Sequence, residues 1–195
     1  RPDDAVLSEE ASDDSPRLHS QRVWIIDPLD GTREFSELDR TDWAVHVALW
    51  ENGDLVAGAV ALPAQGRTLA TPTIRVAASA YAGRPRVVVS RTRPPAVATR
   101  VRDELGGALV EMGSAGAKAM AVVQDQADIY VHAGGQFEWD SAAPVAVARA
   151  VGLHTSRIDG TPLAYNREDP RLPDLLICRP EYADAVLNVI REAGF

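Results

Sequence analysis

The stretch VWIIDPLDGT, residues 23–32, decides both the fold of this chain and its chemistry. Four large apolar residues at 23–26 predict a buried β-strand that ends at Asp27. Pro28 fixes its own φ and has no N–H, while Gly31 permits a tight turn in which the backbone can approach a ligand closely. The stretch therefore predicts a strand that runs directly into a constrained, polar turn.

That turn offers ligands for both a metal ion and an anion. Asp27, Asp30 and the carbonyl of Leu29 are hard oxygen ligands of the kind that Mg²⁺ prefers. Thr32 begins a short helical segment, residues 32–38, and the N-terminus of a helix favours anions. We therefore expect a divalent metal and a phosphate to be held together here. A simple capped strand-to-helix turn is the alternative.

A second acidic motif lies upstream of this stretch. Residues 5–8 predict a short strand that delivers Glu9 and Glu10 at its end, and residues 11–21 predict an acidic, mobile loop. Adjacent glutamates are commonly no more than solvated surface. Their interpretation as part of a metal site therefore depends on the other acidic motifs.

The third acidic motif is Glu138-Trp139-Asp140. Small and β-branched residues at helical spacing predict a helix over residues 141–151, and Gly152 is a typical C-terminal cap. Asp140 is thus expected at or near the N-cap of that helix. Its carboxylate can simply cap the helix. It can also point one oxygen at a metal, since the helix dipole tolerates its charge.

Taken together, four motifs in this order resemble the inositol monophosphatase superfamily of Mg²⁺-dependent, lithium-sensitive phosphatases. They are Ser8-Glu9-Glu10, residues 24–32, residues 113–118 and residues 139–143. Within the superfamily, GTREF at residues 31–35 resembles the CysQ branch, in which a basic residue and a glutamate follow the threonine. That branch removes the 3′-phosphate from 3′-phosphoadenosine 5′-phosphate.

The resemblance implies a cofactor of two or three Mg²⁺ ions. Glu9, Asp27 and the Leu29 carbonyl would hold one ion, and Asp27, Asp30 and Asp140 would hold a second, which makes Asp27 the bridge. Two metals roughly 3.5 to 4 Å apart stabilise both the attacking and the leaving oxygen of an in-line displacement. No covalent phosphoenzyme is therefore required.

The resemblance also implies a catalytic set of Thr32, Asp30 and Glu10. The Thr32 hydroxyl would help to orient the attacking water, and Glu10 would support the site from behind the metal ligands. Gly31 and Thr32 would donate backbone hydrogen bonds to phosphate oxygens. The substrate-binding set that follows is Leu29, Asp30, Gly31, Thr32, Ser114, Lys118, His132 and Asp140.

Three members of that set are candidates for recognising the rest of the substrate. Ser114 and Lys118 lie in GSAGAK, which on its own is a tight strand-to-helix turn but borders the substrate in the family. His132 lies where nucleotide-specific relatives place a basic residue, although a lone histidine is more often structural. His19, His46 and His154 show no spacing that suggests a zinc site, and we assign them no chemistry.

The remaining pattern predicts an α+β fold in two lobes, residues 1–83 and 84–195, joined at 83–85. The first lobe carries antiparallel strands and the metal motifs, and the second is an α/β lobe with the Trp-Asp motif. Expected strands are 43–50, 55–62, 68–70, 74–77, 87–90, 109–112, 128–131 and 175–178, and expected helices are 95–105, 115–123 and 182–193.

The resemblance refines this to the layered αβαβα sandwich of the inositol monophosphatase and fructose-1,6-bisphosphatase type, with the site in the cleft between lobes. The family's N-terminal helical region carries an aspartate that pairs with the motif threonine. No counterpart of that region precedes Arg1, so we expect it to be missing from this chain.

Composition limits the class of protein. A net charge of −8 argues against binding a nucleic-acid polymer, and no apolar run approaches the ~20 residues that span a membrane. The one cysteine, Cys178, cannot form an internal disulfide and is expected in the core. We expect a cytoplasmic enzyme with a small phosphorylated substrate, and a homodimer is left open.

Three functions remain open at this stage. The favoured one is an Mg²⁺-dependent phosphatase that converts 3′-phosphoadenosine 5′-phosphate to AMP, and acts also on its sulfated form, in sulfur assimilation. An inositol monophosphatase or fructose-1,6-bisphosphatase would use the same chemistry. A catalytically silent metal-binding or nucleotide-binding protein is the third.

Overall fold

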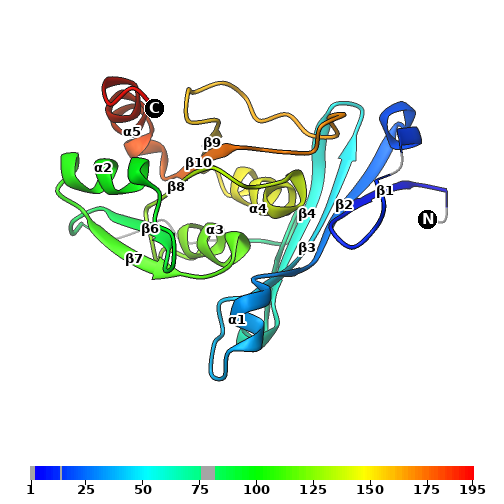
Figure 1. Ribbon diagram of the computed structural model, residues 1–195, viewed down its shortest axis with the longest axis horizontal. Coiled ribbons are helices and arrows are strands. Elements are labelled where there is room, and N and C mark those ends of the chain that lie inside the picture. The colour runs from blue at the N-terminus through cyan, green and yellow to red at the C-terminus, as the bar shows by residue number, and fades with distance from the viewer. Residues whose placement is uncertain (1–2, 14, 76–81) are drawn as a thin grey trace.

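Two five-stranded sheets form the frame of the protein in the computed structural model, which describes residues 3–13, 15–75 and 82–195 (Figure 1). The first sheet has the order β1-β2-β3-β4-β5, and only β1 is parallel to its neighbour. Its strands are β1 (Ala5–Ser8), β2 (Arg22–Asp30), β3 (Ala44–Glu51), β4 (Asp54–Leu62) and β5 (Arg67–Ala70).

The strand β2 is longer than the sequence predicts. Val23, Ile25 and Asp27 are buried and alternate with more exposed residues, so one face of the strand meets the core. Asp27 therefore does not end the strand, which continues to Asp30 with a shift in register between the two aspartates. The expected position of Asp27 was wrong because Pro28 is accommodated at this irregularity.

The second sheet has the order β7-β6-β8-β10-β9 and mixes parallel and antiparallel pairs. Its strands are β6 (Arg86–Ser90), β7 (Ala108–Met112), β8 (Ile129–Ala133), β9 (His154–Ser156) and β10 (Asp174–Cys178). The helices are α1 (Thr32–Ser36), α2 (Ala96–Glu104), α3 (Ala115–Val123), α4 (Glu138–Ala150), α5 (Pro180–Glu192) and the 3₁₀ turns η1 (Ser15–His19) and η2 (Pro63–Gln65).

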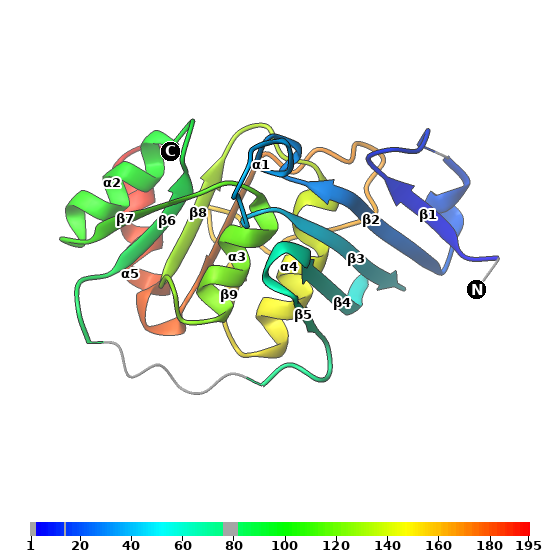
Figure 2. The ribbon, with the colours of Figure 1, turned by 90° about the horizontal axis from the view of Figure 1, so that it is seen from below.

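These elements stack in layers. The α3 and α4 helices lie between the two sheets, and α2 and α5 cover the outer face of the second sheet (Figure 2). One core cluster joins the first sheet to α3, α4 and one face of the second sheet, and the other joins the opposite face to α2 and α5. The predicted α+β layered fold is confirmed, whereas the division into lobes at 83–85 stays a prediction.

Some local predictions were wrong. Ile74 lies in no strand, and residues 76–77 fall outside the described ranges. The α4 helix begins at Glu138 rather than at Ser141, because the N–H of Phe137 bonds to the Asp140 carboxylate (2.7 Å) and caps the helix one turn earlier. Cys178 is fully buried, as expected, and burial raises the pKa of its thiol to about 12.

The segment expected to be a mobile loop at 11–21 contains η1 and a buried side chain. Arg17 is only 1% exposed and pairs with Asp13. A composition rich in charge predicts exposure, and the structure differs because the guanidinium has partners from a distant part of the chain. In the described ranges no helix is long and apolar enough to cross a membrane.

Candidate active site

The turn after β2 is built on a glycine. Gly31 has φ +88°, a left-handed conformation that other residues adopt only with strain, and it is the residue from which α1 begins. The carbonyl of Gly31 accepts the N–H of Phe35 (2.9 Å). The expected helix after Gly31 is therefore present, and it leaves Thr32 exposed at the helix start.

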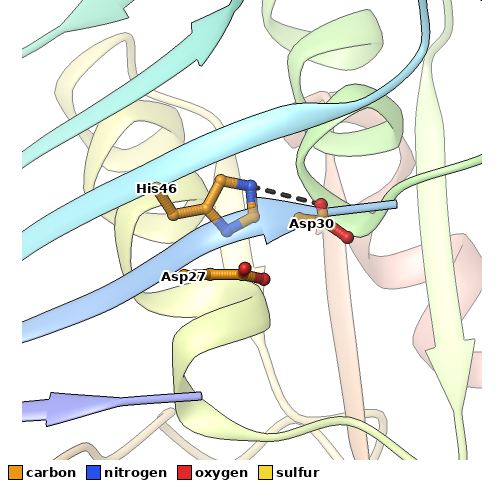
Figure 3. Close-up of side chains that lie close together, drawn as sticks. All are labelled: Asp27, Asp30 and His46. Atoms are coloured by element: carbon orange, nitrogen blue, oxygen red, sulfur yellow. Dashed lines mark ion pairs between the residues drawn. The ribbon is translucent and has the colours of Figure 1, made fainter. Parts of the chain in front are cut away.

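Two of the expected metal ligands meet a histidine at the end of β2 (Figure 3). Asp27, Asp30 and His46 each place one ligand atom within 4.8 Å of the others. All three side chains are buried, with exposed fractions of 7% or less. They come from β2 and the neighbouring β3, in which His46 pairs directly with Asp27.

Asp30 is fixed by the N-terminus of α3. Its carboxylate accepts hydrogen bonds from Ser114 Oγ (2.5 Å), Ala115 N (3.1 Å) and Gly116 N (2.6 Å). Burial alone would raise its pKa, but His46 and these donors outweigh burial and lower the pKa to about 2. Asp30 is therefore a permanent anion, and about one of its roughly four lone-pair positions is left for a metal.

His46 is the functional residue that sequence reasoning missed. Its Nε2 lies 3.2 Å from Asp30 Oδ2 in an ion pair rather than a well-directed hydrogen bond, and its Nδ1 lies 3.0 Å from the carbonyl of Trp139. Burial disfavours the charged ring, but Asp30 and Asp27 outweigh burial and raise its pKa to about 9. The register of β3 against β2 is the signal that would have found it.

The other two acidic side chains of the site are held in unfavourable surroundings. Burial and the charge of Asp30 raise the pKa of Asp27 to about 7 and that of Asp140 to about 6. Within the part of the chain that the structure describes, the Leu29 amide (2.9 Å) is the only hydrogen-bond donor to Asp27. A bound cation stabilises the ionised form of clustered carboxylates, which is disfavoured without it.

The donor set fits a hard divalent ion. Asp27, Asp30 and Asp140 offer carboxylate oxygens, and Leu29 offers a carbonyl that faces the Thr32 hydroxyl at 3.4 Å. Neither ring nitrogen of His46 is available to a metal, because each faces an oxygen of the protein. We therefore assign His46 to holding Asp30 and Trp139 in place.

Glu9 and Glu10 follow β1 in an exposed turn. The charge of Glu9 raises the pKa of both Asp27 and Asp140, so Glu9 is near them although it is outside the 4.8 Å cluster. Among the described residues Glu10 makes no hydrogen bond or ion pair with the cluster, and its expected supporting role stays a prediction.

The predicted recognition residues are less free than the sequence suggests. Ser114 is occupied by Asp30, and it also caps α3 by accepting the N–H of Ala117 (2.9 Å). Lys118 is buried, and its Nζ donates to the carbonyls of Gly113 (2.6 Å) and Ser114 (2.8 Å). Burial lowers its pKa. Lys118 therefore braces the turn that holds Asp30.

A cleft of about 730 Å³ opens over this site. We call Asp27, Asp30, His46 and Asp140 the acidic floor and Arg33 and Arg93 the basic wall. The cleft is lined by Asp30, Gly31, Thr32, Arg33, Glu34, Ser90, Thr92, Arg93, Pro94, Pro95, Gly113, Ser114, Ala115, Lys118, His132, Ala133, Gly134, Gly135, Gln136 and Asp140.

Unlike Ser114 and Lys118, the two arginines of the basic wall have side chains that no other described residue pairs with. Arg33 and Arg93 are exposed, and among the described residues neither guanidinium has an ion-pair partner. Burial, together with the charges of Lys118 and Arg93, lowers the pKa of His132, which lies 2.5 Å from the Gly134 carbonyl. Arg33 belongs to the GTREF motif that pointed to the substrate, whereas Arg93 was missed because it lies in a proline-containing turn far from the acidic motifs.

Two glycines allow the turn before α3 to sit this close. A Cβ on Gly116 would lie 2.0 Å from Nε2 of His46, and one on Gly113 would lie 2.2 Å from the side chain of Glu34. Real Cβ atoms do not approach other atoms so closely. The two glycines of the GSAGAK segment therefore leave the space that a side chain of β3 and one of α1 fill.

Comparison with known proteins identifies the class to which this fold and site belong. The model of the inositol monophosphatase family matches residues 1–74 and 70–193, and the chain belongs to this family. The predicted family is confirmed.

Individual relatives narrow the comparison. The chain is 57% identical over 201 residues to the 3′-phosphoadenosine 5′-phosphate phosphatase of Mycobacterium bovis, covering 99% of this chain and 75% of that protein. It is 33% identical over 178 residues to the 3′(2′),5′-bisphosphate nucleotidase CysQ of Escherichia coli K12, covering 84% and 71%. The crystal structure of CysQ from Bacteroides thetaiotaomicron superposes with a TM-score of 0.74 at 27% identity, covering 91% and 77%.

Proposed function

We propose that this protein hydrolyses the 3′-phosphate of 3′-phosphoadenosine 5′-phosphate with bound Mg²⁺ ions, releasing AMP. That it is a phosphatase follows from its family. The choice of substrate is the proposal, and one observation carries it: Asp30 and Asp140 of the acidic floor line the same cleft as the unpaired arginines of the basic wall. A substrate with two separated phosphates needs one group at the floor and another at the wall.

The acidic floor provides the reaction chemistry in this proposal. Asp27, Asp30 and Asp140 would hold the ions together with Glu9 and the Leu29 carbonyl. When bound, divalent ions polarise the phosphate and lower the pKa of water. His46 and the α3 N-terminus keep Asp30 ionised, so that this ligand is ready without a proton being lost.

The turn after β2 would bind the phosphate itself. The start of α1 presents backbone N–H groups from Gly31 and Thr32 at a helix N-terminus, where anions are favoured. The exposed hydroxyl of Thr32 is free to orient water, since its 3.4 Å contact with the Leu29 carbonyl is long. Departure of the 3′-oxygen needs a proton from solvent, which the open cleft admits.

The basic wall would bind the second phosphate. Arg33 and Arg93 offer planar guanidinium groups that match phosphate oxygens in a bidentate way. Inositol 1-phosphate has no second phosphate to use them. The relatives named above, which act on bisphosphate nucleotides by their names, support the same choice.

The test is a steady-state assay of the purified chain with three substrates, with Mg²⁺ and with a chelator. We expect kcat/KM for 3′-phosphoadenosine 5′-phosphate to exceed that for inositol 1-phosphate by at least ~10-fold, the worth of one charge-assisted bond. Fructose 1,6-bisphosphate also carries two phosphates, so its comparison with the nucleotide measures recognition of the nucleoside instead. Equal values would favour the sugar-phosphate alternative. Absence of turnover beside retained metal binding would favour the silent binding protein.

The proposal extends to inhibition and setting. We propose that Li⁺ inhibits where Na⁺ and K⁺ at equal ionic strength do not, because the same oxygen ligands serve a small hard cation. An assay with the three chlorides tests this, and equal inhibition would indicate an ionic-strength effect. A cytoplasmic role in sulfur assimilation, with action on the sulfated nucleotide, completes the proposal, and a homodimer stays a prediction.

A further inference from the structure

Outside the cleft, Arg17 is a buried charge with several directed bonds. Its guanidinium is 1% exposed and donates to Asp13 from Nε (2.6 Å) and Nη2 (2.9 Å). It also donates from Nη1 to Asn166 Oδ1 (2.7 Å) and from Nη2 to the Arg167 carbonyl (2.8 Å). A buried arginine with this many directed bonds is held in a single orientation.

Asn166, which accepts a hydrogen bond from Arg17, is itself held in place. Asn166 returns a hydrogen bond from Nδ2 to the Arg17 carbonyl (3.3 Å) across 149 residues of chain. Its backbone is left-handed, with φ 59°, a conformation that asparagine tolerates better than most residues. The loop at 166–167 is thus shaped to receive η1.

The same loop is bound to the helix that carries Asp140. Glu138, the first residue of α4, accepts the N–H groups of Asn166 (2.6 Å) and Arg167 (2.8 Å). Glu138 is 1% exposed, and its negative charge helps to raise the pKa of Arg17. A continuous chain of bonds therefore runs from η1 through the loop to the start of α4.

That chain of bonds joins the two sides of the proposed metal site. Glu9 lies in the exposed turn between β1 and η1, and Asp140 lies two residues after Glu138. The Glu9 side chain makes no hydrogen bond within the described residues. The residue before it, Ser8, is held in β1 by its pairing with Ile26, so the freedom that is left to Glu9 depends on what anchors the segment that follows it.

We propose that Arg17 is a positioning residue that fixes Glu9 relative to Asp140 and thereby sets the affinity of the metal site to which both carboxylates belong. This inference rests on the proposed function. Arg17 touches neither metal nor substrate. Without it, the segment at 9–21 is released from α4, and Glu9 has to be ordered each time a metal binds.

The experiment measures Mn²⁺ binding by calorimetry on the purified chain, without substrate. Arg17→Met is expected to weaken binding by about tenfold, the equivalent of one lost charge-assisted contact. Asn166→Gly keeps the left-handed backbone and removes the side-chain bond, so a smaller loss is expected. Arg22→Met is the matched control, because Arg22 pairs with Asp4 before β1 and makes no hydrogen bond or ion pair with α4 among the described residues.

A double-variant cycle separates positioning from general destabilisation. If Arg17 acts through Glu9, Arg17→Met causes no further loss of Mn²⁺ affinity in a Glu9→Gln background. Unchanged affinity in Arg17→Met with a lower melting temperature, or losses that simply add, would overturn the inference. If Arg17→Met does not fold, the same cycle is performed with Asn166→Gly.

A second readout needs no metal at all. Amide hydrogen exchange at residues 9–13 of the metal-free protein is expected to speed up in Arg17→Met and to stay unchanged in Arg22→Met. Failure of the wild-type chain to bind Mn²⁺ would refute the proposed function. Unchanged exchange in Arg17→Met would instead refute the positioning role of Arg17. The two failures are therefore distinguishable.

Discussion

The acidic floor and the basic wall face the same cleft but are built in opposite ways. The floor is buried, each of its groups is held by others, and the pKa values of its members are driven apart to about 2 for Asp30 and about 9 for His46. The wall is exposed, and within the described part of the chain its two arginines are unpaired. Rigid, desolvated groups suit the reaction, whereas free, solvated groups suit recognition of a ligand.

The difference predicts different costs of substitution. A change in the floor alters charge where the local dielectric is low and cannot be compensated by water. A change in the wall removes a contact that water can partly replace. Floor variants should therefore lose turnover, and wall variants should lose affinity for one substrate class.

The largest effect is expected for Asp27→Asn. The substitution keeps the shape of the side chain but removes the negative charge that would bridge two ions, so activity should fall on the order of a thousandfold or more. The melting temperature should change little, because Asp27 accepts only one hydrogen bond in the described structure. Full turnover by this variant in the presence of chelator would contradict the two-metal interpretation.

Gly116→Ala tests how tightly the floor is packed. Its Cβ would lie 2.0 Å from Nε2 of His46, so His46 must move away from Asp30. We expect a loss of about 1–3 kcal/mol in the free energy of unfolding, the usual cost of overpacking, and a fall in kcat. Urea unfolding and kinetics measure both. Gly66→Ala, where a Cβ meets nothing but φ is +62°, measures backbone strain without a clash, a strain that Gly116 does not carry.

Arg33→Ala and Arg93→Ala test the wall. Each should raise KM for 3′-phosphoadenosine 5′-phosphate by about tenfold, because a charge-assisted bond worth ~1.5 kcal/mol is lost, and should leave KM for inositol 1-phosphate nearly unchanged. Lys118→Ala should affect both substrates equally, since Lys118 Nζ is bound to two carbonyls. A rise in KM for both substrates in the arginine variants would remove the wall from recognition.

The smallest effect is a dependence of metal-free stability on pH. The pKa of Asp27 is raised from 3.8 to about 7, so the folded state binds more protons than the unfolded state in this window. Stability contributed by protonated Asp27 is present below the unfolded pKa and is lost as pH rises through the folded pKa.

Unfolding in urea between about pH 4 and about pH 7 measures this slope. Asp140 contributes in the same direction, with a pKa raised to about 6. Asp27→Asn should flatten the slope, and saturating Mg²⁺ should remove it by stabilising the ionised carboxylates. A metal-free wild type whose stability rose steadily over this range would show that the carboxylates are not held as described.

The layered fold could be predicted because its signals lie in contiguous residues. The hairpin of β3 and β4 followed from two apolar runs on either side of Asn52-Gly53, both of which have positive φ in the structure. The α3 helix matched its predicted bounds, Ala115–Val123, because a glycine turn precedes a run of small apolar residues. Residues 154–156 were missed, since a three-residue strand carries almost no pattern.

By itself, the sequence determined the acidic motifs, the constrained turn at Gly31 and the family to which the chain belongs, because each depends on neighbouring residues. Tertiary structure alone decided that His46 pairs with Asp30, that Ser114 donates to Asp30, and that Arg17 is buried. A side chain's partners across 16, 84 or 149 residues are set by strand register and layer packing rather than by spacing along the chain. Such long-range neighbours decide whether a polar residue is solvated surface or part of a site.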